Sequence, residues 1–320
     1  MKNNIKNKPL YGIALISFGL IIGVLIGVLG NSIFNNNSAA KLQERYDLIA
    51  KRALIENPND MLLDFAKLES QIEDYNNTLP ANKTSIYFEY LPTGTSIGIN
   101  EKEELAGASL LKTPLAVNLY KTAQEGKINI DKPIALKKEW LNSQYGNLYK
   151  KGEGYQLTLR EAAQIMLRDS DNTASLMIFN NLAEVVPINN MLLSFIDVDF
   201  GVNKDESIRI GAQTYSSILK CLYFTCYNDK DSSQEILSYL SESNFNNRLK
   251  LYLPNDIKVA HKIGTYDAEG AVHIQSDCGI FYITNRNYLL CVMVKGEEPE
   301  ANRIIGDISK ITYDFITKKQ

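Results

Sequence analysis

The chain has 320 residues, of which 45% are hydrophobic and 22% are charged, and its formal net charge is −3. A chain of this length and composition can bury a sizeable core, as one large domain or two small ones. No basic block follows the first few residues, so we expect no nucleic-acid partner. His261 and His273 are the only histidines, and no His-Glu-x-x-His sequence occurs, so we expect no metal site and no cofactor.

The N-terminal segment predicts a transmembrane helix. Residues 11–30 carry no charge and are about as long as a helix that spans a bilayer. Three lysines precede this run, at Lys2, Lys6 and Lys8, which predicts that residues 1–10 form a cytoplasmic tail. We therefore expect a single-pass protein of the cell membrane whose remaining chain is extracytoplasmic.

Two further interpretations of this segment stay open. Small residues at 38–40 would suit a cleaved signal peptide instead of an uncleaved anchor. Gly19, Gly23 and Gly27 fall at four-residue spacing, which can let two membrane helices approach closely and form a weak homodimer.

A polar segment follows the membrane run. Within residues 31–58, apolar side chains from Leu42 to Ala53 recur at four-three-four spacing, which predicts a helical stalk or linker. Residues 59–320 are then expected to form a single domain.

Helical and strand patterns occupy separate parts of that domain. Helical patterns cover residues 62–75, 109–125, 158–169, 173–182, 188–195, 213–224 and 304–315, and strand patterns cover residues 85–90, 96–100, 259–265, 270–274, 278–283 and 288–294. Strands at both ends with helices between them predict an α+β fold, in which one antiparallel sheet is flanked by helices and interrupted by an inserted all-helical subdomain. The turn-rich segment 140–154 and its neighbour carry Tyr145, Tyr149 and Tyr155, which either wall a cleft or simply pack.

The four cysteines lie in a region predicted to be outside the cell, where disulfides are possible. Cys221 and Cys226 are five residues apart on a predicted helix, which is a poor spacing for a local bridge. Cys278 and Cys291 lie on successive predicted strands. We expect all four to be buried as small hydrophobic residues, with Cys278–Cys291 the pair to bridge if any does.

A Ser-x-x-Lys sequence at the start of a predicted helix suggests a nucleophile beside a base. At this spacing the Ser109 hydroxyl and the Lys112 amine lie on one helix face. The amine can act as a base only if it is neutral, and burial or a second cation such as Lys262 would lower its pKa. Further matches begin at Ser38 and Ser217, and we regard both as chance.

Only the match at Ser109 is followed by an ordered pair of companion motifs. Ser170-Asp171-Asn172 stands downstream, and Lys262-x-Gly264 lies on a predicted strand beyond it. This trio resembles the serine β-lactamase and penicillin-binding protein superfamily, and most of all the class A β-lactamases, over roughly residues 60–320. The resemblance implies a β-lactamase/transpeptidase-like fold with the active site in the cleft between its two parts.

The resemblance implies a catalytic role for four of these residues. Ser109 would attack a carbonyl to form an acyl-enzyme, and Lys112 would take or relay its proton. Ser170 would pass the proton to the leaving nitrogen, because a hydroxyl can both donate and accept. Lys262 would attract a substrate carboxylate and help to keep Lys112 neutral.

Four further positions are expected to support substrate binding and local structure. Asn172 would hold Lys112 and the substrate amide, and Gly264 would let the substrate approach the strand edge. The backbone N–H groups of Ser109 and Thr265 would form an oxyanion hole. Asp171 would cap the following helix, and a plain turn is the alternative interpretation of Ser-Asp-Asn.

Two departures from the family pattern affect the expected chemistry. Ile263 stands where a hydroxyl residue is usual, so a hydrogen bond to the substrate carboxylate is missing unless Thr265 supplies it. Between residues 197 and 213 the chain lacks the Glu-x-x-Leu-Asn sequence whose glutamate activates the deacylating water. Possible replacements are Asp199, Asp205 and Glu206. Without such a base the acyl-enzyme should be hydrolysed slowly.

The sequence therefore predicts a membrane-anchored, extracytoplasmic serine hydrolase that acts on β-lactams or on D-Ala-D-Ala-like peptides of the peptidoglycan stem. One alternative is a penicillin-binding sensor or DD-peptidase that deacylates slowly. Another is an esterase that pairs Ser109 with His261 or His273.

Overall fold

The computed structural model describes residues 45–50, 64–187, 208–270 and 272–318. The predicted membrane segment 11–30, most of the predicted stalk and the predicted helix 188–195 lie outside these ranges. Among the described residues, no helix is both long enough and apolar enough to cross a bilayer.

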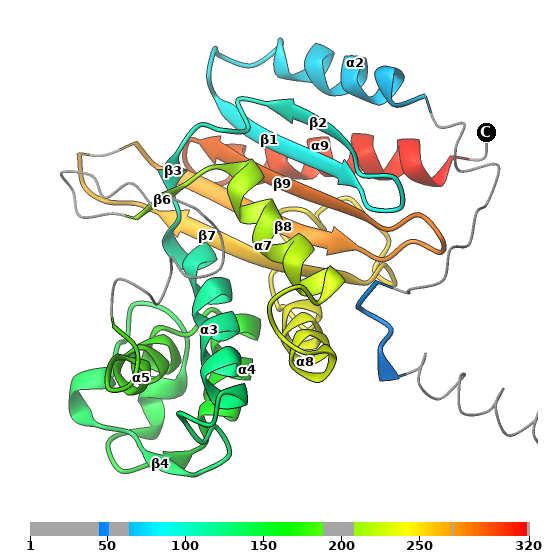
Figure 1. Ribbon diagram of the computed structural model, residues 1–320. Coiled ribbons are helices and arrows are strands. Elements are labelled where there is room, and N and C mark those ends of the chain that lie inside the picture. The colour runs from blue at the N-terminus through cyan, green and yellow to red at the C-terminus, as the bar shows by residue number, and fades with distance from the viewer. Residues whose placement is uncertain (1–44, 51–63, 188–207, 271, 319–320) are drawn as a thin grey trace, which may run out of the picture. The chain divides into compact units, whose positions relative to one another are not determined.

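A five-stranded antiparallel sheet in the order β2-β1-β9-β8-β7 forms the centre of the fold (Figure 1). Its strands are β1 (Thr84–Tyr90), β2 (Thr95–Ile99), β7 (Val259–Tyr266), β8 (Ile274–Phe281) and β9 (Tyr288–Lys295). Strand β1 pairs along its whole length with β9, from Thr84 opposite Val294 to Tyr90 opposite Tyr288. The prediction of one antiparallel sheet assembled from both ends of the domain is confirmed.

The separate strand predicted at residues 270–274 is wrong. The chain instead forms the single strand β8, which begins at Ile274 and includes the polar residues Gln275, Ser276 and Asp277. These residues are buried, although strand patterns favour apolar side chains at such positions. Gln275 bonds to an arginine and Asp277 bonds to a histidine, so the polar run can lie within the sheet.

Helices cover both faces of the sheet and form a separate cluster beside it (Figure 1). The helices are α2 (Phe65–Asn76), α3 (Lys112–Gln124), α4 (Leu159–Arg168), α5 (Asn172–Ala183), α7 (Ala212–Phe224), α8 (Lys230–Ser241) and α9 (Glu300–Thr317). Helices α2 and α9 lie on one face and α7 on the other, while α3, α4 and α5 form the inserted cluster. Two short strand pairs tie loops together: β3 (Leu105–Ala106) with β6 (Arg209–Ile210), and β4 (Ile134–Ala135) with β5 (Gln156–Leu157).

The main hydrophobic core lies between the sheet and helices α2 and α9. Leu68 and Ile72 of α2 meet Ile304 and Ile308 of α9 over the apolar side chains of the strands. The apolar faces predicted for these two helices are confirmed. Helix α2 is capped by Asp64, whose carboxylate accepts the N–H of Ala66.

Helix α8 was not predicted from the sequence. Asp229 caps this helix by accepting the N–H of Ser232. The buried face combines Ile236, Leu237 and Leu240 with Ser232 and Ser233, so the first turn of the helix shows no apolar period. A hydrophobic pattern therefore begins too late to predict the element.

All four cysteines are paired, which corrects the expectation that they are free. Cys278 and Cys291 sit opposite each other on β8 and β9, as predicted for that pair if it bridged. The bridge between Cys221 and Cys226 was not expected. Helix α7 ends at Phe224, and Thr225 adopts a left-handed conformation with φ of 53°, so the chain turns back and brings Cys226 to the helix end.

Part of the predicted stalk belongs to the folded domain. Residues 46–50 are not helical, and Leu48 and Ile49 are buried in the same compact unit as the sheet. The Leu48 N–H donates to Gln234 Oε1, and the Leu48 carbonyl accepts the Tyr282 hydroxyl. The prediction of a continuous helix is therefore wrong at these residues. The apolar side chains of Leu48 and Ile49 are buried in the domain, and they do not form the apolar face of a helix.

We expect Leu48→Ala to lower the free energy of unfolding by about 2–5 kcal/mol, because it leaves a cavity in a buried site. Chemical denaturation of the full chain would measure the change. Val272→Ala is the matched control, because Val272 is 62% exposed and should change stability little. An equal effect of the two substitutions would show that Leu48 is not part of the domain's packing.

Candidate active site

Ser109 lies in a 3₁₀ turn at Ala108–Leu111, immediately before helix α3. The predicted helix therefore begins at Lys112 and not at Ser109, but the Lys112 N–H still donates to the Ser109 carbonyl. Ala108 has a φ of 43°, a left-handed conformation that costs a non-glycine residue on the order of 1 kcal/mol or more. The strained turn leaves the Ser109 side chain partly exposed.

The edge strand β7 packs closely against this turn at Gly264. A Cβ atom at position 264 would lie 3.0 Å from Leu110 Cγ and 3.1 Å from the Gly107 carbonyl oxygen. A larger residue would push the strand away from the turn that carries Ser109. Gly264 is therefore placed as predicted, at the strand edge, and its small size also brings the edge to the serine.

The Lys112 amine is buried and surrounded by acceptors. Its side chain donates to Asn172 Oδ1 at 2.7 Å, to the Ser170 carbonyl and, more weakly, to Ser170 Oγ at 3.4 Å. Burial lowers the pKa of Lys112 to about 7, although the negative charge of Asp171 acts to raise it. A large fraction of the amine is therefore neutral near neutral pH and able to accept a proton.

Ser170 stands between two amines. Lys262 Nζ donates to Ser170 Oγ at 2.8 Å and to the Ile263 carbonyl at 3.1 Å. Ser170 itself has a φ of 55° and is only 1% exposed. Burial lowers the pKa of Lys262 well below its ordinary value, and the charges of Lys112 and Arg248 act in the same direction.

The tight turn after Ser170 is fixed by the carboxylate of Asp171. Asp171 Oδ1 accepts the Ala174 N–H at 2.9 Å and caps α5, as predicted, while Oδ2 accepts the Leu148 N–H at 2.8 Å. A Cβ at Gly146 would lie 2.0 Å from Asp171 Oδ2, and Gly146 has a φ of 89°. Only glycine fits at position 146. The loop that carries Tyr145 therefore packs directly against Asp171 in the turn after Ser170.

Four of the residues predicted for the site are thus brought together: Lys112, Ser170, Asn172 and Lys262. Ser109 lies on the turn next to them, yet its hydroxyl makes no hydrogen bond to these four residues. Catalytic hydrogen bonds often form only when substrate is bound. Thr265 follows on the same strand, and its hydroxyl accepts from Arg248 at 2.7 Å and bonds to Gln275 at 3.0 Å.

Arg248 adjoins the site, although its sequence context did not predict it. It is 1% exposed, and its guanidinium donates to the carbonyls of Gly264 and Ser276, both at 2.8 Å. The same group donates to the side chains of Thr265, Gln275, Asn302 and Glu298. Arg248 follows two asparagines and precedes a leucine, and no pattern in these neighbours predicts this network. The guanidinium lies against β7, at Gly264 and Thr265.

Two aromatic rings from separate loops meet beside Lys262. The ring centroids of Tyr145 and Phe245 are 6.0 Å apart, and Lys262 Nζ lies 5.9 Å from the Phe245 centroid. Such a position over a ring favours the charged amine. Of the three tyrosines considered above, Tyr145 is therefore the one that adjoins the site, while Tyr155 contacts Lys151.

Neither histidine is placed for an esterase. His261 is 1% exposed and bonds to Asp277, whereas His273 lies near the exposed Asp267. No hydrogen bond links either ring to Ser109 in the part of the chain that is described. Over the same ranges, no group of three or more His, Cys, Asp or Glu side chains gathers that could hold a metal ion.

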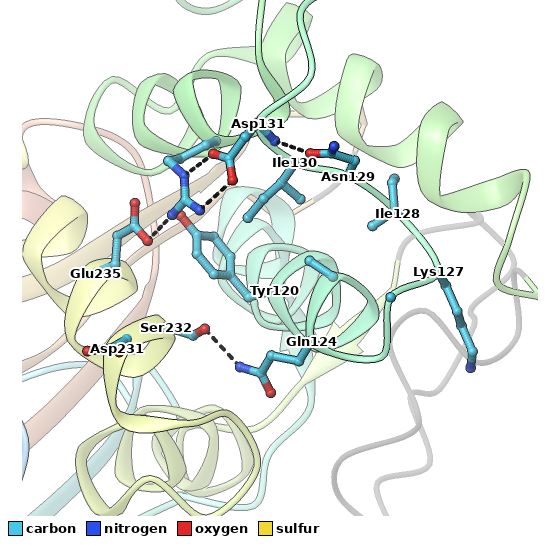
Figure 2. A pocket seen from close by; sticks show the side chains of 13 residues that line it. Tyr120, Gln124, Lys127, Ile128, Asn129, Ile130, Asp131, Asp231, Ser232 and Glu235 are labelled. Carbon is cyan, nitrogen blue, oxygen red and sulfur yellow. Dashed lines mark hydrogen bonds and ion pairs between the residues drawn. The ribbon is translucent and has the colours of Figure 1, made fainter.

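A cavity of about 510 Å³ lies elsewhere, between α3, α4 and α8 (Figure 2). Its lining contains none of the catalytic candidates. Two cations line it: Arg160 is bonded to the carboxylates of Asp131 and Glu235, and Lys127 pairs with Glu125. We assign no reaction to this cavity, because both cations are already paired with carboxylates.

Comparisons with known proteins find relatives by sequence and by fold. A family model described as "Beta-lactamase enzyme family" matches residues 67–316. Beta-lactamase VEB-1 of Pseudomonas aeruginosa is 22% identical over 251 residues, which cover 70% of this chain and 82% of VEB-1. Among solved structures, the TLA-3 extended-spectrum beta-lactamase has a TM-score of 0.71 at 22% identity, covering 79% of this chain and 99% of its own. PBP-A has a TM-score of 0.67 at 21% identity, and the match covers 78% of this chain and 95% of the PBP-A chain.

Proposed function

This chain belongs to the beta-lactamase enzyme family, and from that premise we propose that it is an extracytoplasmic serine hydrolase acting through Ser109 on β-lactams or D-Ala-D-Ala-like peptides. The observation that carries the proposal is the sharing of Ser170 by two buried amines, Lys112 and Lys262, beside the Ser109 turn. This arrangement offers a base, a proton relay and a positive charge next to one nucleophile.

In the proposed reaction, Ser109 Oγ forms a bond to the substrate carbonyl carbon while the amide C–N bond breaks. Lys112, neutral in part because its pKa is about 7, takes the hydroxyl proton. Ser170, which accepts from both amines, passes a proton to the leaving nitrogen. Asn172 holds Lys112 in place through its side-chain oxygen. Hydrolysis of the resulting ester by water completes the turnover.

Attraction of the substrate carboxylate is assigned to Lys262, with Arg248 adding charge behind the strand. Ile263 supplies no hydroxyl, and the hydroxyl of Thr265 is already engaged by Arg248 and Gln275. Electrostatic attraction therefore has to replace the usual hydroxyl contact. The backbone N–H groups of Ser109 and Thr265 remain the proposed oxyanion hole.

A second candidate is a penicillin-binding sensor or DD-peptidase that stays acylated. Two observations favour it: the missing Glu-x-x-Leu-Asn sequence, and a fold similar to PBP-A as well as to β-lactamases. The possible replacement bases Asp199, Asp205 and Glu206 lie outside the described residues.

We place the domain outside the cell, held by a single membrane helix at residues 11–30 that can pair through Gly19, Gly23 and Gly27. The uncharged run and the lysines before it support the anchor. The disulfides Cys221–Cys226 and Cys278–Cys291 support an oxidising compartment.

The intact mass of the detergent-solubilised full chain, followed over time after mixing with benzylpenicillin, tests the proposal. A transient adduct is expected for a hydrolase and a lasting adduct for the sensor or peptidase. Ser109→Ala should form no adduct. An adduct on the Ser109→Ala protein, or none on the wild type, would contradict acyl transfer through Ser109.

A further inference from the structure

An exposed group of lysines lies on a hairpin beside the candidate site. Strands β4 and β5 form its arms, and their pairing continues beyond them. The Leu136 N–H donates to the Tyr155 carbonyl and the Gly154 N–H donates to the Leu136 carbonyl, both at 2.8 Å. Two lysine pairs that are distant in the sequence are thereby brought to the same end of the hairpin. We call this group the lysine surface: Lys137, Lys138, Lys150 and Lys151.

The lysine surface carries free positive charge. All four side chains are exposed, and within the described ranges none of them forms an ion pair. By contrast, Arg160 and Lys127 are both paired with carboxylates. The only acidic residues between positions 136 and 155 are Glu139 and Glu153, so four lysines and two glutamates give this loop a net charge of +2, in a chain whose net charge is −3. The loop is therefore expected to attract anions.

Aromatic rings adjoin two of these amines. Lys150 Nζ lies 5.9 Å from the ring centroid of Tyr149, and Lys151 Nζ lies 5.4 Å from that of Tyr155. Tyr155 is 40% exposed, so its ring and the neighbouring ammonium group face solvent together. A flat ring beside a cation suits a ligand that combines apolar faces, such as those of sugar rings, with negative charges.

The same loop is fastened to the Ser-Asp-Asn turn of the candidate site. Asp171 Oδ2 accepts the Leu148 N–H at 2.8 Å, and this residue begins the 3₁₀ turn Leu148–Lys151, which contains two of the lysines. The Tyr145 carbonyl accepts the Asn172 N–H at 3.0 Å. The lysine surface therefore begins within one turn of chain from a residue that contacts the candidate site.

We propose that the lysine surface binds the peptidoglycan strand whose stem peptide enters the site. The inference rests on the proposed function, which places a D-Ala-D-Ala-like peptide at Ser109. Such a peptide is the end of a longer stem, whose other carboxylates and attached glycan have to lie against a surface beside the site. The ammonium groups complement those carboxylates, and the tyrosine rings offer flat faces to the sugars.

An anionic membrane surface is the other partner that lysines would attract. The chain leads to the proposed anchor through Leu48, which bonds to Gln234 of α8 and to Tyr282 after β8, on elements outside this hairpin. The lysine surface is instead fastened to the Ser-Asp-Asn turn, which favours a ligand that also occupies the site.

Cosedimentation of the detergent-solubilised full chain with purified peptidoglycan sacculi, stripped of teichoic acids, tests the inference. Lys150→Gln combined with Lys151→Gln should weaken binding about three- to tenfold, because two exposed ionic contacts are lost. Lys67→Gln combined with Lys102→Gln is the matched control, because it removes the same charge from two exposed lysines outside the hairpin and should change binding little. Equal losses in the two double variants would show a nonspecific effect of charge and overturn the inference.

A second test leaves the protein unchanged. Sacculi whose carboxylates are blocked with glycinamide and a carbodiimide lose negative charge but keep their glycan. The wild type should bind them more weakly than untreated sacculi, by at least the factor found for the double variant, because contacts of all four lysines are lost. Unchanged binding would overturn the inference.

Two further measurements separate this inference from its neighbours. Benzylpenicillin has neither stem nor glycan, so it should acylate the wild type and both double variants at equal rates. If it acylates none of them, the proposed function fails, and sedimentation still decides the role of the lysine surface. In nanodiscs, hydrogen exchange of residues 136–155 should be the same with phosphatidylcholine and with phosphatidylglycerol. Protection only with phosphatidylglycerol would assign the surface to the membrane and overturn the inference.

Discussion

Replacing Lys112 by methionine should slow acylation of Ser109 by about 10²- to 10⁴-fold, the usual contribution of a positioned base. Burial lowers the pKa of Lys112 from 10.5 to about 7. The wild-type rate should therefore rise between pH 6 and pH 8, as the amine loses its proton, and level off above that. In Lys112→Met this rise should disappear, because the group that titrates is gone.

Labelling with a fluorescent penicillin, quenched at fixed times across this pH range, would measure both the acylation rate and its pH dependence. Lys127→Met is a suitable control, because Lys127 is 57% exposed and pairs with Glu125, away from the candidate site. A pH-dependent rise that survives in Lys112→Met would mean that another group, with Lys262 the first candidate, removes the serine proton. Retained wild-type rates would contradict the proposed base altogether.

Replacing Arg248 by methionine should cost about 3–5 kcal/mol of folding free energy, because it removes a buried, ion-paired guanidinium together with the hydrogen bonds that it donates to two carbonyls and four side chains. The hydrogen bonds lost include those to the carbonyls of Gly264 and Ser276. For a domain of this size the melting temperature should fall by roughly 10 °C. Acylation should also slow, since Gly264 and Thr265 form the edge that meets the Ser109 turn.

Thermal unfolding followed by circular dichroism would measure the loss. Arg248→Lys should lie between the wild type and Arg248→Met, because an ammonium has fewer donors and lacks the planar fork. Arg303→Met provides the control, since Arg303 is 53% exposed and pairs with Asp307 on its own helix. A melting temperature for Arg248→Met equal to that of the control would show that the network does not stabilise the domain.

Sequence patterns predicted the structure correctly where the interacting residues lie within a few positions of each other in the chain. The cap at Asp171 was predicted because it depends on a hydrogen bond between residues three positions apart in the chain. The apolar periods of α2 and α9 likewise follow from one-sided burial. Helix α8 and the polar start of β8 were misjudged because their buried positions hold serines, a glutamine and an aspartate.

Some residues of the candidate site could likewise be predicted from the sequence, and others could not. The Ser109 and Lys112 spacing, the Ser-Asp-Asn turn and the strand carrying Lys262 could be read from the chain, and their order suggested a family. Arg248 and the pair of His261 with Asp277 could not, because each is defined by acceptors and donors on distant segments. Nothing in their immediate neighbours indicates that they are buried.

The sequence by itself determined which groups are available and which stand side by side: a hydroxyl three residues before an amine, a capped turn, and strands at both ends of a helical insert. The tertiary structure alone decided how those groups behave. Water is excluded from Lys112 and Lys262 only after the segments pack, and removal of water is what lowers their pKa values. Burial and long-range hydrogen bonding are properties of the assembled fold, so local residue patterns cannot report them.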